Sequence, residues 1–386
     1  MTATTAHTSP GAGVKHPRIG ILGGGQLGKM LTQAAMNFDL HLSIMDSSPD
    51  APCEPYCHNF VVGDLNDFDA VYAFGRDVEL LTIEIEDVNV PALKKLEAEG
   101  ILISPSPDII GIIQDKGNQK DFLRRNGIPT AAFALAHGPD DIRKFNVFPA
   151  IQKLRRAGYD GRGVRRIESS AGAAVAFTKP SIVEELIDIA KELSVIVARS
   201  RTGEMKVYPS VEMVFHEANL IDFLVAPADI PPRIEKEAEE LAITVAEKLS
   251  IVGLAAVEMF LTRDGRVLVN EIAPRPHNSG HHTIEANVTS QYEQHLRAII
   301  GLPLGSTATL SPAVMVNLIG EPGFDGPVRY EGLDETLKVE GANVHIYGKK
   351  STRPHRKMGH VTILDPSREG AIQKARFVRN TLKVKA

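Results

Sequence analysis

Long apolar runs, an excess of basic residues and a cysteine framework are all absent from this sequence of 386 residues. No apolar stretch approaches the roughly 20 residues that a membrane-spanning helix needs, and residues 1–13 lack the apolar centre of a secretory signal. The formal net charge is −5, so no overall positive field would draw the chain to nucleic acid or to an anionic membrane. These absences predict a cytoplasmic protein with no nucleic acid and no membrane as partner, in which any phosphate is bound locally.

Cysteine is limited to Cys53 and Cys57, four positions apart. With no further cysteine nearby, a metal site built on them would be incomplete, so we expect two reduced thiols. The hydrophobic share of 43% is enough for two or three domains with buried cores. Only residues 1–16, rich in Ala, Thr, Gly and Pro, cannot bury much, and there we expect a loose tail.

Strand and helix patterns alternate in the first part of the chain. Apolar strands at 18–22, 41–46, 60–62 and 80–83 and a helix at 26–38 predict a parallel, doubly wound α/β sheet. After Pro105 the pattern changes to two short helices that flank Asp115, followed by β-rich segments. The domains that we expect are a tail at 1–16, a doubly wound substrate-binding domain at 17–112, a central domain at 113–300 and a small β-rich domain at 301–386.

The central and last parts contain further elements. An apolar stripe predicts a helix over 234–249, and apolar runs predict strands over 149–153, 254–262 and 267–272. Asp264-Gly265 stands between the last two runs and predicts a two-residue hairpin loop. Short strands are expected at 314–318 and 344–347.

The first glycine loop, Gly23 to Gly28, follows a strand and opens a helix, as in dinucleotide-binding folds. Asp46 ends the next strand, near the place of a ribose-binding acid. An NAD-dependent oxidoreductase is therefore one interpretation. Backbone N–H groups at a helix N-terminus attract any phosphate, however, so another phosphate ligand or tight packing explains the motif equally well.

Two acids are expected to face each other across the hairpin. Counting outward from a two-residue loop places Glu258 directly opposite Glu271, within strongly apolar runs. Like charges in such a place need a cation between them, and two carboxylates suit Mg²⁺ that is also bound by substrate phosphates. The alternative is that one acid bonds a buried lysine or arginine.

Lys153 ends a predicted strand and is followed by a second glycine loop, residues 157–163. A lysine charge and a glycine backbone that permits close approach suit a triphosphate, and closure of the loop would exclude water. An ordinary exposed hairpin is the alternative.

Histidines crowd the stretch that follows Glu271. Zinc bound by His277, His281 and His282 is one interpretation, but two prolines and a glycine oppose a regular helix that would present them together. Arg275 and His277 fit better as an anion-orienting group and a proton-handling group. The basic residues of 349–360 could bind a substrate phosphate or form a solvated surface.

Four stretches taken together resemble one enzyme family. They are Gly23–Gly28, Gly158–Gly163, Asn270-Glu-Ile-Ala-Pro-Arg-Pro-His-Asn-Ser-Gly-His281 and Lys357-Met-Gly-His360. The family is that of the 5-(carboxyamino)imidazole ribonucleotide synthases, ATP-grasp enzymes also described as the ATPase subunit of phosphoribosylaminoimidazole carboxylase. The resemblance runs from about Arg18 into the last domain. It implies mixed α/β and α+β architecture: a doubly wound domain, a central ATP-grasp domain and a small C-terminal domain.

The resemblance also implies a set of site residues. ATP would be contacted by Lys116, Lys153, Gly158, Tyr159, Asp160, Gly161, Arg162, Gly163, Glu184, Glu185, Leu186, Ile187, Glu192, Asn270 and Glu271. Glu258 and Glu271 would hold Mg²⁺. The substrate and the chemistry would involve Gln26, Leu27, Glu84 or Glu86, Tyr159, Asp160, Arg162, Arg275 and His277, with Lys350, Arg356 and Lys357 near the ribotide phosphate.

The implied reaction is the carboxylation of 5-aminoimidazole ribonucleotide with ATP and bicarbonate, in purine biosynthesis. A homodimer is implied, and the mutase that rearranges the product is the implied functional partner. Ala157 replaces a usual glycine and Arg162 a common lysine, which puts the mobility of the loop in question. Some relatives continue into a mutase domain, for which too little chain remains here, so we expect a separate synthase or an excised part of a longer protein. The rival interpretations are an ATP-grasp ligase for another ribotide, the NAD oxidoreductase, and a regulator without turnover.

Overall fold

The computed structural model describes residues 17–156, 163–215 and 221–386, and its first part is a five-stranded parallel sheet of order β3-β2-β1-β4-β5. The strands are β1 (Ile19–Leu22), β2 (Leu42–Asp46), β3 (Asn59–Val62), β4 (Leu80–Ile83) and β5 (Leu102–Ser104). The helices of this part are α1 (Gln26–Met36), the short 3₁₀ turn η1 (Glu54–Tyr56), α2 (Phe68–Arg76) and α3 (Val90–Ala98). Every residue of β1 and β4 is buried, as expected where helices cover both faces of a parallel sheet.

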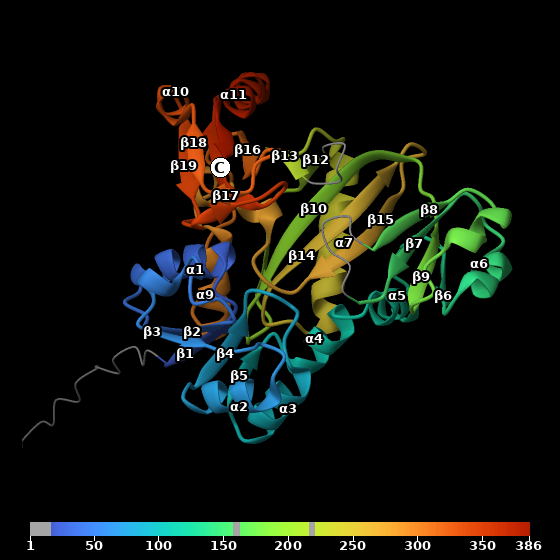
Figure 1. Ribbon diagram of the computed structural model, residues 1–386, viewed down its shortest axis with the longest axis horizontal. Coiled ribbons are helices and arrows are strands. Elements are labelled where there is room, and N and C mark those ends of the chain that lie inside the picture. The colour runs from blue at the N-terminus through green and yellow to red at the C-terminus, as the bar shows by residue number, and fades with distance from the viewer. Residues whose placement is uncertain (1–16, 157–162, 216–220) are drawn as a thin grey trace, which may run out of the picture.

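Different helices pack against the two faces of this sheet (Figure 1). Helices α2 and α3 pack against one face. Helix α1 packs against the other, together with α9 (Gln291–Ile300), which comes from much later in the chain. The N-terminal sheet is therefore joined to the central part through a shared apolar core.

Two short helices lead into the central part, as predicted. They are α4 (Pro107–Ile113) and α5 (Lys116–Arg125). Asp115 stands between them and caps α5, because its side chain accepts hydrogen bonds from the backbone N–H groups of Gly117 and Asn118. The cap fixes the start of α5, and with it the position of Lys116.

A four-stranded antiparallel sheet of order β6-β9-β7-β8 follows. Its elements are β6 (Phe133–Ala136), α6 (Pro139–Phe145), β7 (Ala150–Leu154), β8 (Val164–Ile167), the 3₁₀ turn η2 (Ala171–Val175) and β9 (Ser181–Glu185). Figure 1 shows this sheet and α6 at the right of the molecule, beside the long strands β10, β14 and β15.

Nine strands form the largest sheet, along the path β15-β14-β10-β12-β13-β16-β21-β19, with β11 paired to β10. They are β10 (Ile189–Arg199), β11 (Met205–Val207), β12 (Val211–Phe215), β13 (Ile221–Ala226), β14 (Gly253–Thr262), β15 (Val267–Ala273), β16 (Ala313–Ile319), β19 (Ala342–Ile346) and β21 (Lys357–Leu364). Helix α7 (Pro232–Leu249) packs on β10, β14 and β15, and its boundaries are close to those predicted. The 3₁₀ turn η3 (Asn278–Gly280) and α8 (Thr283–Ala286) lead from β15 to α9.

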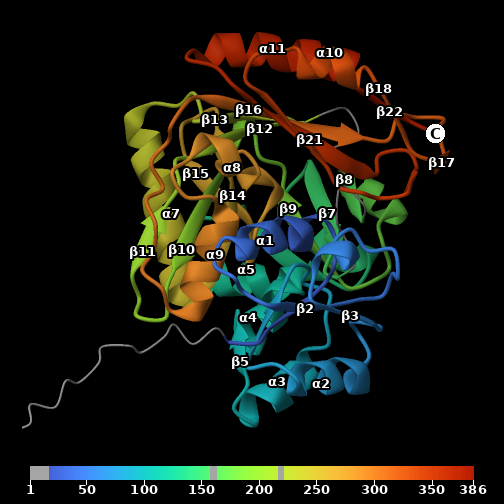
Figure 2. The same cartoon turned by 90° about the vertical axis from the view of Figure 1, so that its left-hand side faces the viewer.

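The C-terminal strands belong to this same sheet. Strand β16 pairs with β13. Backbone hydrogen bonds therefore join a strand of the central part to a strand that follows residue 300, the position at which we expected the central domain to end. Helices α10 (Leu333–Leu337) and α11 (Arg368–Thr381) lie along one edge of the molecule, over β16 and β21 (Figure 2). Two small sheets complete this part: β17 (Gly326–Pro327) with β20 (Ser351–Thr352), and β18 (Arg329–Glu331) with β22 (Lys383–Lys385). Within the described ranges, no helix combines the length and the apolar character needed to cross a bilayer.

Candidate functional site

Glu258 on β14 and Glu271 on β15 lie directly opposite each other, as predicted. The hairpin that brings them together differs from the predicted one in its loop and in its register. The predicted two-residue loop is wrong: Thr262 pairs with Arg266, and Gly265 adopts a positive φ of 83°, so the loop has three residues. A register shift between Glu258 and Met259 then adds one residue on β15. The longer loop and this bulge cancel, so the two acids meet again.

The two carboxyl groups differ in charge. Burial raises the pKa of Glu258 to about 7, and the nearby carboxylates of Glu271 and Glu192 add to the effect. Burial also opposes ionisation of Glu271, but the ammonium of Lys116 forms an ion pair with it and holds its pKa below the ordinary value. The alternative contact, an acid bonded to a lysine, is therefore present. Two opposed carboxylates remain a hard oxygen donor set that fits Mg²⁺.

Lys153, at the end of β7, reaches across to the large sheet. Its ammonium lies 2.7 Å from Oε2 of Glu184 and donates to Oδ1 of Asn270 at 3.0 Å. Burial disfavours this charge, but the carboxylates of Glu184, Glu271 and Glu258 together raise its pKa. The four-stranded and nine-stranded sheets thus bring a group of predicted residues together: Lys116, Lys153, Glu184, Asn270 and Glu271.

The segment predicted to lie beside adenine connects β9 to β10. Leu186 is exposed, and its N–H donates to Pro149 O at 3.1 Å, whereas Glu185 accepts from the N–H of Ala132 at 2.9 Å. Ile187 follows, and Glu192 lies further along β10 on the face that carries Glu258. Burial raises the pKa of Glu192 to about 7, against the effect of the Lys153 charge.

Arg275 and His277 follow β15 and approach acids from other segments. Arg275 Nε lies 2.8 Å from Oε1 of Glu86, and His277 Nε2 lies 3.4 Å from Oε1 of Glu258. Burial, then the charges of Arg275 and Lys357, lower the pKa of His277 to about 3, so its ring is neutral. His277 Nδ1 lies 2.9 Å from the hydroxyl and 3.3 Å from the backbone nitrogen of Ser279, and Nε2 faces Glu258.

The first glycine loop binds an anion of its own chain. Both oxygens of Glu84 accept backbone hydrogen bonds, from Gly25 N at 2.8 Å and from Gly28 N at 2.7 Å. A Cβ at Gly25 would come within 2.4 Å of Glu84 Oε1, which explains the need for glycine there. Asp46 accepts from Gly24 N at 2.7 Å. The N–H groups that a dinucleotide phosphate needs are already bonded, which argues against the NAD interpretation.

Of the two candidate substrate acids, Glu84 is thus held by the loop and Glu86 by Arg275. Leu27 is buried in the core beneath the loop. Gln26 accepts a hydrogen bond at 3.0 Å from Lys349, a residue of the predicted basic cluster that the resemblance did not place near the ribotide phosphate.

Of the two adjacent lysines, Lys349 and Lys350, the first points inward. It also donates to Lys357 O at 2.7 Å, and burial, with help from the charge of Arg356, lowers its pKa to about 8. Lys350 has a side chain that is 76% exposed and pairs with Asp50. No local pattern separates the two lysines, because they follow the end of β19 at Ile346 and Gly348 before them adopts a positive φ of 88°, so strand alternation does not extend to them.

The other expected phosphate-binding residues lie at the start of β21. Arg356 donates to Ser351 O at 2.8 Å, and burial lowers its pKa. The charge of Lys357 helps to lower the pKa of His277 and partly offsets the rise in the pKa of Glu258, which places it near both groups. Residues of the N-terminal, central and C-terminal parts therefore converge on one site.

Part of the second glycine loop lies outside the described residues, namely the predicted site residues Gly158, Tyr159, Asp160, Gly161 and Arg162, together with Ala157. Gly163 is described and has a positive φ of 73°. Its carbonyl accepts from Leu154 N at 2.8 Å, which closes the β7–β8 hairpin beside Lys153.

The histidine-rich stretch does not assemble the zinc site considered above. His281 is buried and bonded through Nδ1 to the hydroxyl of Tyr292 at 2.8 Å, whereas His277 faces Glu258. Among the residues that the structure describes, no group of three or more His, Cys, Asp or Glu side chains could hold a metal ion. Cys53 and Cys57 are free thiols.

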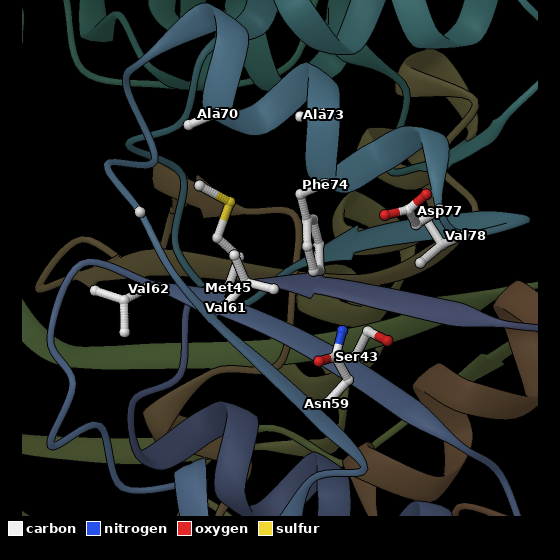
Figure 3. A pocket seen from close by; sticks show the side chains of 11 residues that line it. Ser43, Met45, Asn59, Val61, Val62, Ala70, Ala73, Phe74, Asp77 and Val78 are labelled. Carbon is white, nitrogen blue, oxygen red and sulfur yellow. The ribbon is translucent and has the colours of Figure 1, made fainter.

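A cavity of about 260 Å³ lies elsewhere, between α2 and the strands β2 and β3 (Figure 3). Phe74 points from α2 toward the strands, where Met45 and Val61 lie, and Asp77 is the charged residue of the lining. It shares no residue with the convergent site, and its mostly apolar lining offers little to a phosphate.

Three family models match the chain in succession. They are the ribonucleotide synthetase preATP-grasp domain at residues 17–114, the ATP-grasp domain at 121–292 and the phosphoribosylaminoimidazole carboxylase C-terminal domain at 313–374.

Curated relatives cover nearly the whole chain. The N5-carboxyaminoimidazole ribonucleotide synthase of Bacillus subtilis is 36% identical over 362 residues, 92% of this chain and 93% of that protein. The chloroplastic phosphoribosylaminoimidazole carboxylase of Vigna aconitifolia is 38% identical over 364 residues, which are 90% of this chain but 64% of that protein. The chain thus spans less than two thirds of the plant enzyme.

Solved structures are similar over the same extent. The N5-carboxyaminoimidazole ribonucleotide synthetase of Thermotoga maritima has a TM-score of 0.90 and 44% identity, covering 96% of this chain and 99% of that one. The synthase of Aspergillus clavatus in complex with ADP and 5-aminoimidazole ribonucleotide has a TM-score of 0.86 and 31% identity, covering 94% and 98%.

Proposed function

The chain belongs to the N5-carboxyaminoimidazole ribonucleotide synthase family of ATP-grasp ligases, and from this premise we propose that it carboxylates the exocyclic amine of 5-aminoimidazole ribonucleotide. ATP and bicarbonate are consumed, and ADP and phosphate are released. The observation that carries the proposal is the convergence of Lys116, Lys153 and Lys357, cations from the central and C-terminal parts of the chain, on the Glu258 and Glu271 pair.

The first half of the reaction takes place on the nucleotide side. A bicarbonate oxygen attacks the γ-phosphorus of ATP, the bond to ADP breaks, and carboxyphosphate forms. Lys153 and Lys116 offset the negative charge that develops on the phosphoryl oxygens. Glu258 and Glu271 fit Mg²⁺ and would hold it, and the ion would supply further neutralisation of the phosphates.

The second half takes place on the ribotide side. Carboxyphosphate breaks down to CO₂ and phosphate, the amine nitrogen attacks the carbon of CO₂, and the nitrogen loses a proton. Asp160 or His277 is the proposed acceptor. Arg275, held by Glu86 at 2.8 Å, is placed to bind the anion. For His277 to take the proton, the ring nitrogen that accepts it must first give up its contact with Ser279 or with Glu258.

The remaining residues on the nucleotide side keep the roles implied by the family resemblance. We propose that Tyr159, Asp160, Arg162 and Gly158–Gly163 belong to a loop over the phosphates, that 184–187 line the adenine, and that Glu192 lies near the ribose. Because Glu184 is enclosed in ion pairs, its main chain rather than its carboxylate would face the base.

We also propose a wider setting. The enzyme acts as a homodimer in the cytoplasm, its domains span 17–112, 113–300 and 301–386, and its product passes to a mutase. Light scattering on the purified chain tests the dimer, since a monomer at micromolar concentration would overturn it.

The reaction itself is tested by ADP release with ATP, Mg²⁺ and bicarbonate, with and without 5-aminoimidazole ribonucleotide. We expect the ribotide to stimulate release and labelled bicarbonate to enter an acid-labile product in equal amount. ADP release at the same rate with and without the ribotide would mean that another molecule accepts the carboxyl group. A chain that releases no ADP under any of these conditions would contradict the ligase assignment.

The two adjacent lysines provide a matched test of the ribotide side. Replacing Lys349 with methionine removes a buried charge that is bonded to Gln26, whereas replacing Lys350 removes an exposed one. We expect Lys349→Met to raise KM for the ribotide about tenfold to a hundredfold and to leave KM for ATP within about threefold. Lys350→Met should change either constant by less than about threefold, and the reverse order would assign the phosphate to the exposed lysine.

A further inference from the structure

Lys120, on α5, is a buried lysine to which the proposed reaction assigns no role. Only 3% of it is exposed. Its ammonium forms an ion pair with Glu184 and donates to the hydroxyl of Thr130 at 2.6 Å, and that hydroxyl donates to Val269 O at 2.6 Å. Burial of an ammonium is unfavourable unless it is paired, so an apolar side chain at this position would stabilise the core more than a lysine does.

The carboxylate of Glu184 is shared between two lysines. Oε1 contacts Lys120, and Oε2 lies 2.7 Å from Lys153. Glu184 is also only 3% exposed, so water does not screen these contacts. One negative charge between two positive charges leaves the group with a net charge of +1.

Lys153 has limited freedom within this group. Its ammonium has three N–H donors, of which one is directed to Glu184 and one to Asn270 at 3.0 Å. One donor and an incompletely neutralised charge are left for a ligand. If Lys120 were uncharged, Glu184 could turn both oxygens toward Lys153 and cancel that charge.

We propose that Lys120 is a positioning residue for the nucleotide, which keeps one oxygen of Glu184 occupied so that the Lys153 ammonium stays aimed and charged toward a polyphosphate. The inference rests on the proposed function in one respect, that Lys153 binds the phosphates of ATP. Lys120 itself is enclosed behind Glu184 and touches no substrate. A purely structural role, in which Lys120 only holds α5 to β9, has different consequences for ligands with and without phosphates.

The test compares the affinities of two ligands, ADP with Mg²⁺ and adenosine, in the Lys120→Met variant of the full chain. Calorimetry measures the first, and competition against a fluorescent nucleotide measures the second. We expect ADP to bind about tenfold to a hundredfold more weakly and adenosine to change less than about threefold. Lys236→Met is the control, since that side chain is 77% exposed and pairs with Glu240 one helical turn away.

A double variant distinguishes the positioning role of Lys120 from a purely structural role. Lys120→Met combined with Glu184→Gln removes both the cation and the carboxylate that would neutralise Lys153, so ADP affinity should return to within about threefold of the unaltered chain. It also removes the buried carboxylate that has lost one of its two cations, so it remains informative if the single variant fails to fold. Equal weakening of ADP and adenosine, or a double variant that binds ADP as poorly as the single one, overturns the proposal. Absence of ADP binding by the unaltered chain would instead refute the proposed function, because these measurements require neither bicarbonate nor the ribotide.

Discussion

Replacing Glu271 with glutamine should lower kcat for ribotide-stimulated ADP release by about a hundredfold to a thousandfold and raise the Mg²⁺ concentration needed for half-maximal rate. Glu271 lies opposite Glu258 on paired strands, and Lys116 holds its pKa below the ordinary value, so it carries its charge at neutral pH. A glutamine keeps the shape but offers a neutral oxygen, which is a much poorer ligand for a hard divalent cation.

The measurement is a Mg²⁺ titration of ADP release at fixed ATP. It separates two roles of Glu271, because an acid that serves only to pair with Lys116 would change KM for ATP without changing the Mg²⁺ dependence. An unchanged Mg²⁺ dependence would therefore remove Glu271 from the proposed metal site. Glu212→Gln is the matched control: this acid also sits in the large sheet and pairs with Lys191 at 2.6 Å, but on the face opposite to that of Glu258.

The pairing of Glu258 with Glu271 shows how a sequence prediction can succeed although one of its steps is wrong. Asp264-Gly265 was expected to form a two-residue loop, and the loop has three residues. The bulge that compensates for it has no sequence signal of its own, because Asn270 next to Glu271 is not a residue that demands one. The apolar runs that flank the two acids were the sounder evidence, since they predicted the strands.

The first glycine loop shows the opposite case, a strong motif with an unexpected ligand. Its strand, turn and helix were all predicted, and β1 and α1 confirm them. The carboxylate of Glu84, more than fifty residues away, takes the N–H groups that a phosphate would use. Such a contact depends on the order β1-β4 in the sheet, which local patterns do not specify.

Long-range pairing also explains what was not expected at the C-terminus. The strands near 314–318 and 344–347 were predicted from local apolar runs, and β16 and β19 lie there. That β16 continues the central sheet by pairing with β13 is a matter of non-local hydrogen bonds. The same geometry turns Lys349 rather than Lys350 inward, because the side of the segment that faces the protein is decided by the strands around it.

Buried histidines lead to the second large effect that we expect, a dependence of stability on pH that one residue can reveal. His295 lies where α9 meets both the N-terminal sheet and β14: its Nε2 is 2.9 Å from Oγ1 of Thr82, and a Cβ at Gly253 would approach its ring to 2.9 Å. Among the described residues, Nδ1 has no hydrogen-bond partner. Burial lowers the pKa of His295 to about 3, so the folded chain keeps the ring neutral.

The direction of the pH dependence of stability follows from whether the folded or the unfolded chain binds the proton. An unfolded histidine has a pKa near 6.5, so between about pH 6.5 and pH 3 the unfolded chain takes up a proton that folded His295 refuses. The stability that His295 contributes is complete above pH 6.5 and is lost as the pH falls. Burial lowers the pKa of His277 to about 3 and that of His282 to about 4, and it also lowers the pKa values of His281 and His360, so all four act in the same direction. Glu192 and Glu258, whose pKa values burial raises to about 7, oppose them. The slope for the whole chain is a difference between these groups, and a single variant isolates one of them.

His295→Gln can still bond to Thr82 but cannot gain a charge, so its unfolding free energy should lack one pH-dependent component. From pH 7.5 to pH 5 we expect the difference in stability between variant and unaltered chain to shift by about 2 kcal/mol in favour of the variant, from about 1.4 kcal/mol per pH unit over the 1.5 units below pH 6.5. Urea unfolding of the variant and of the unaltered chain at both pH values measures this difference. A constant difference between His295→Gln and the unaltered chain would mean that His295 is charged in the folded protein, which requires an acid or water at Nδ1 and a looser junction between α9 and β4.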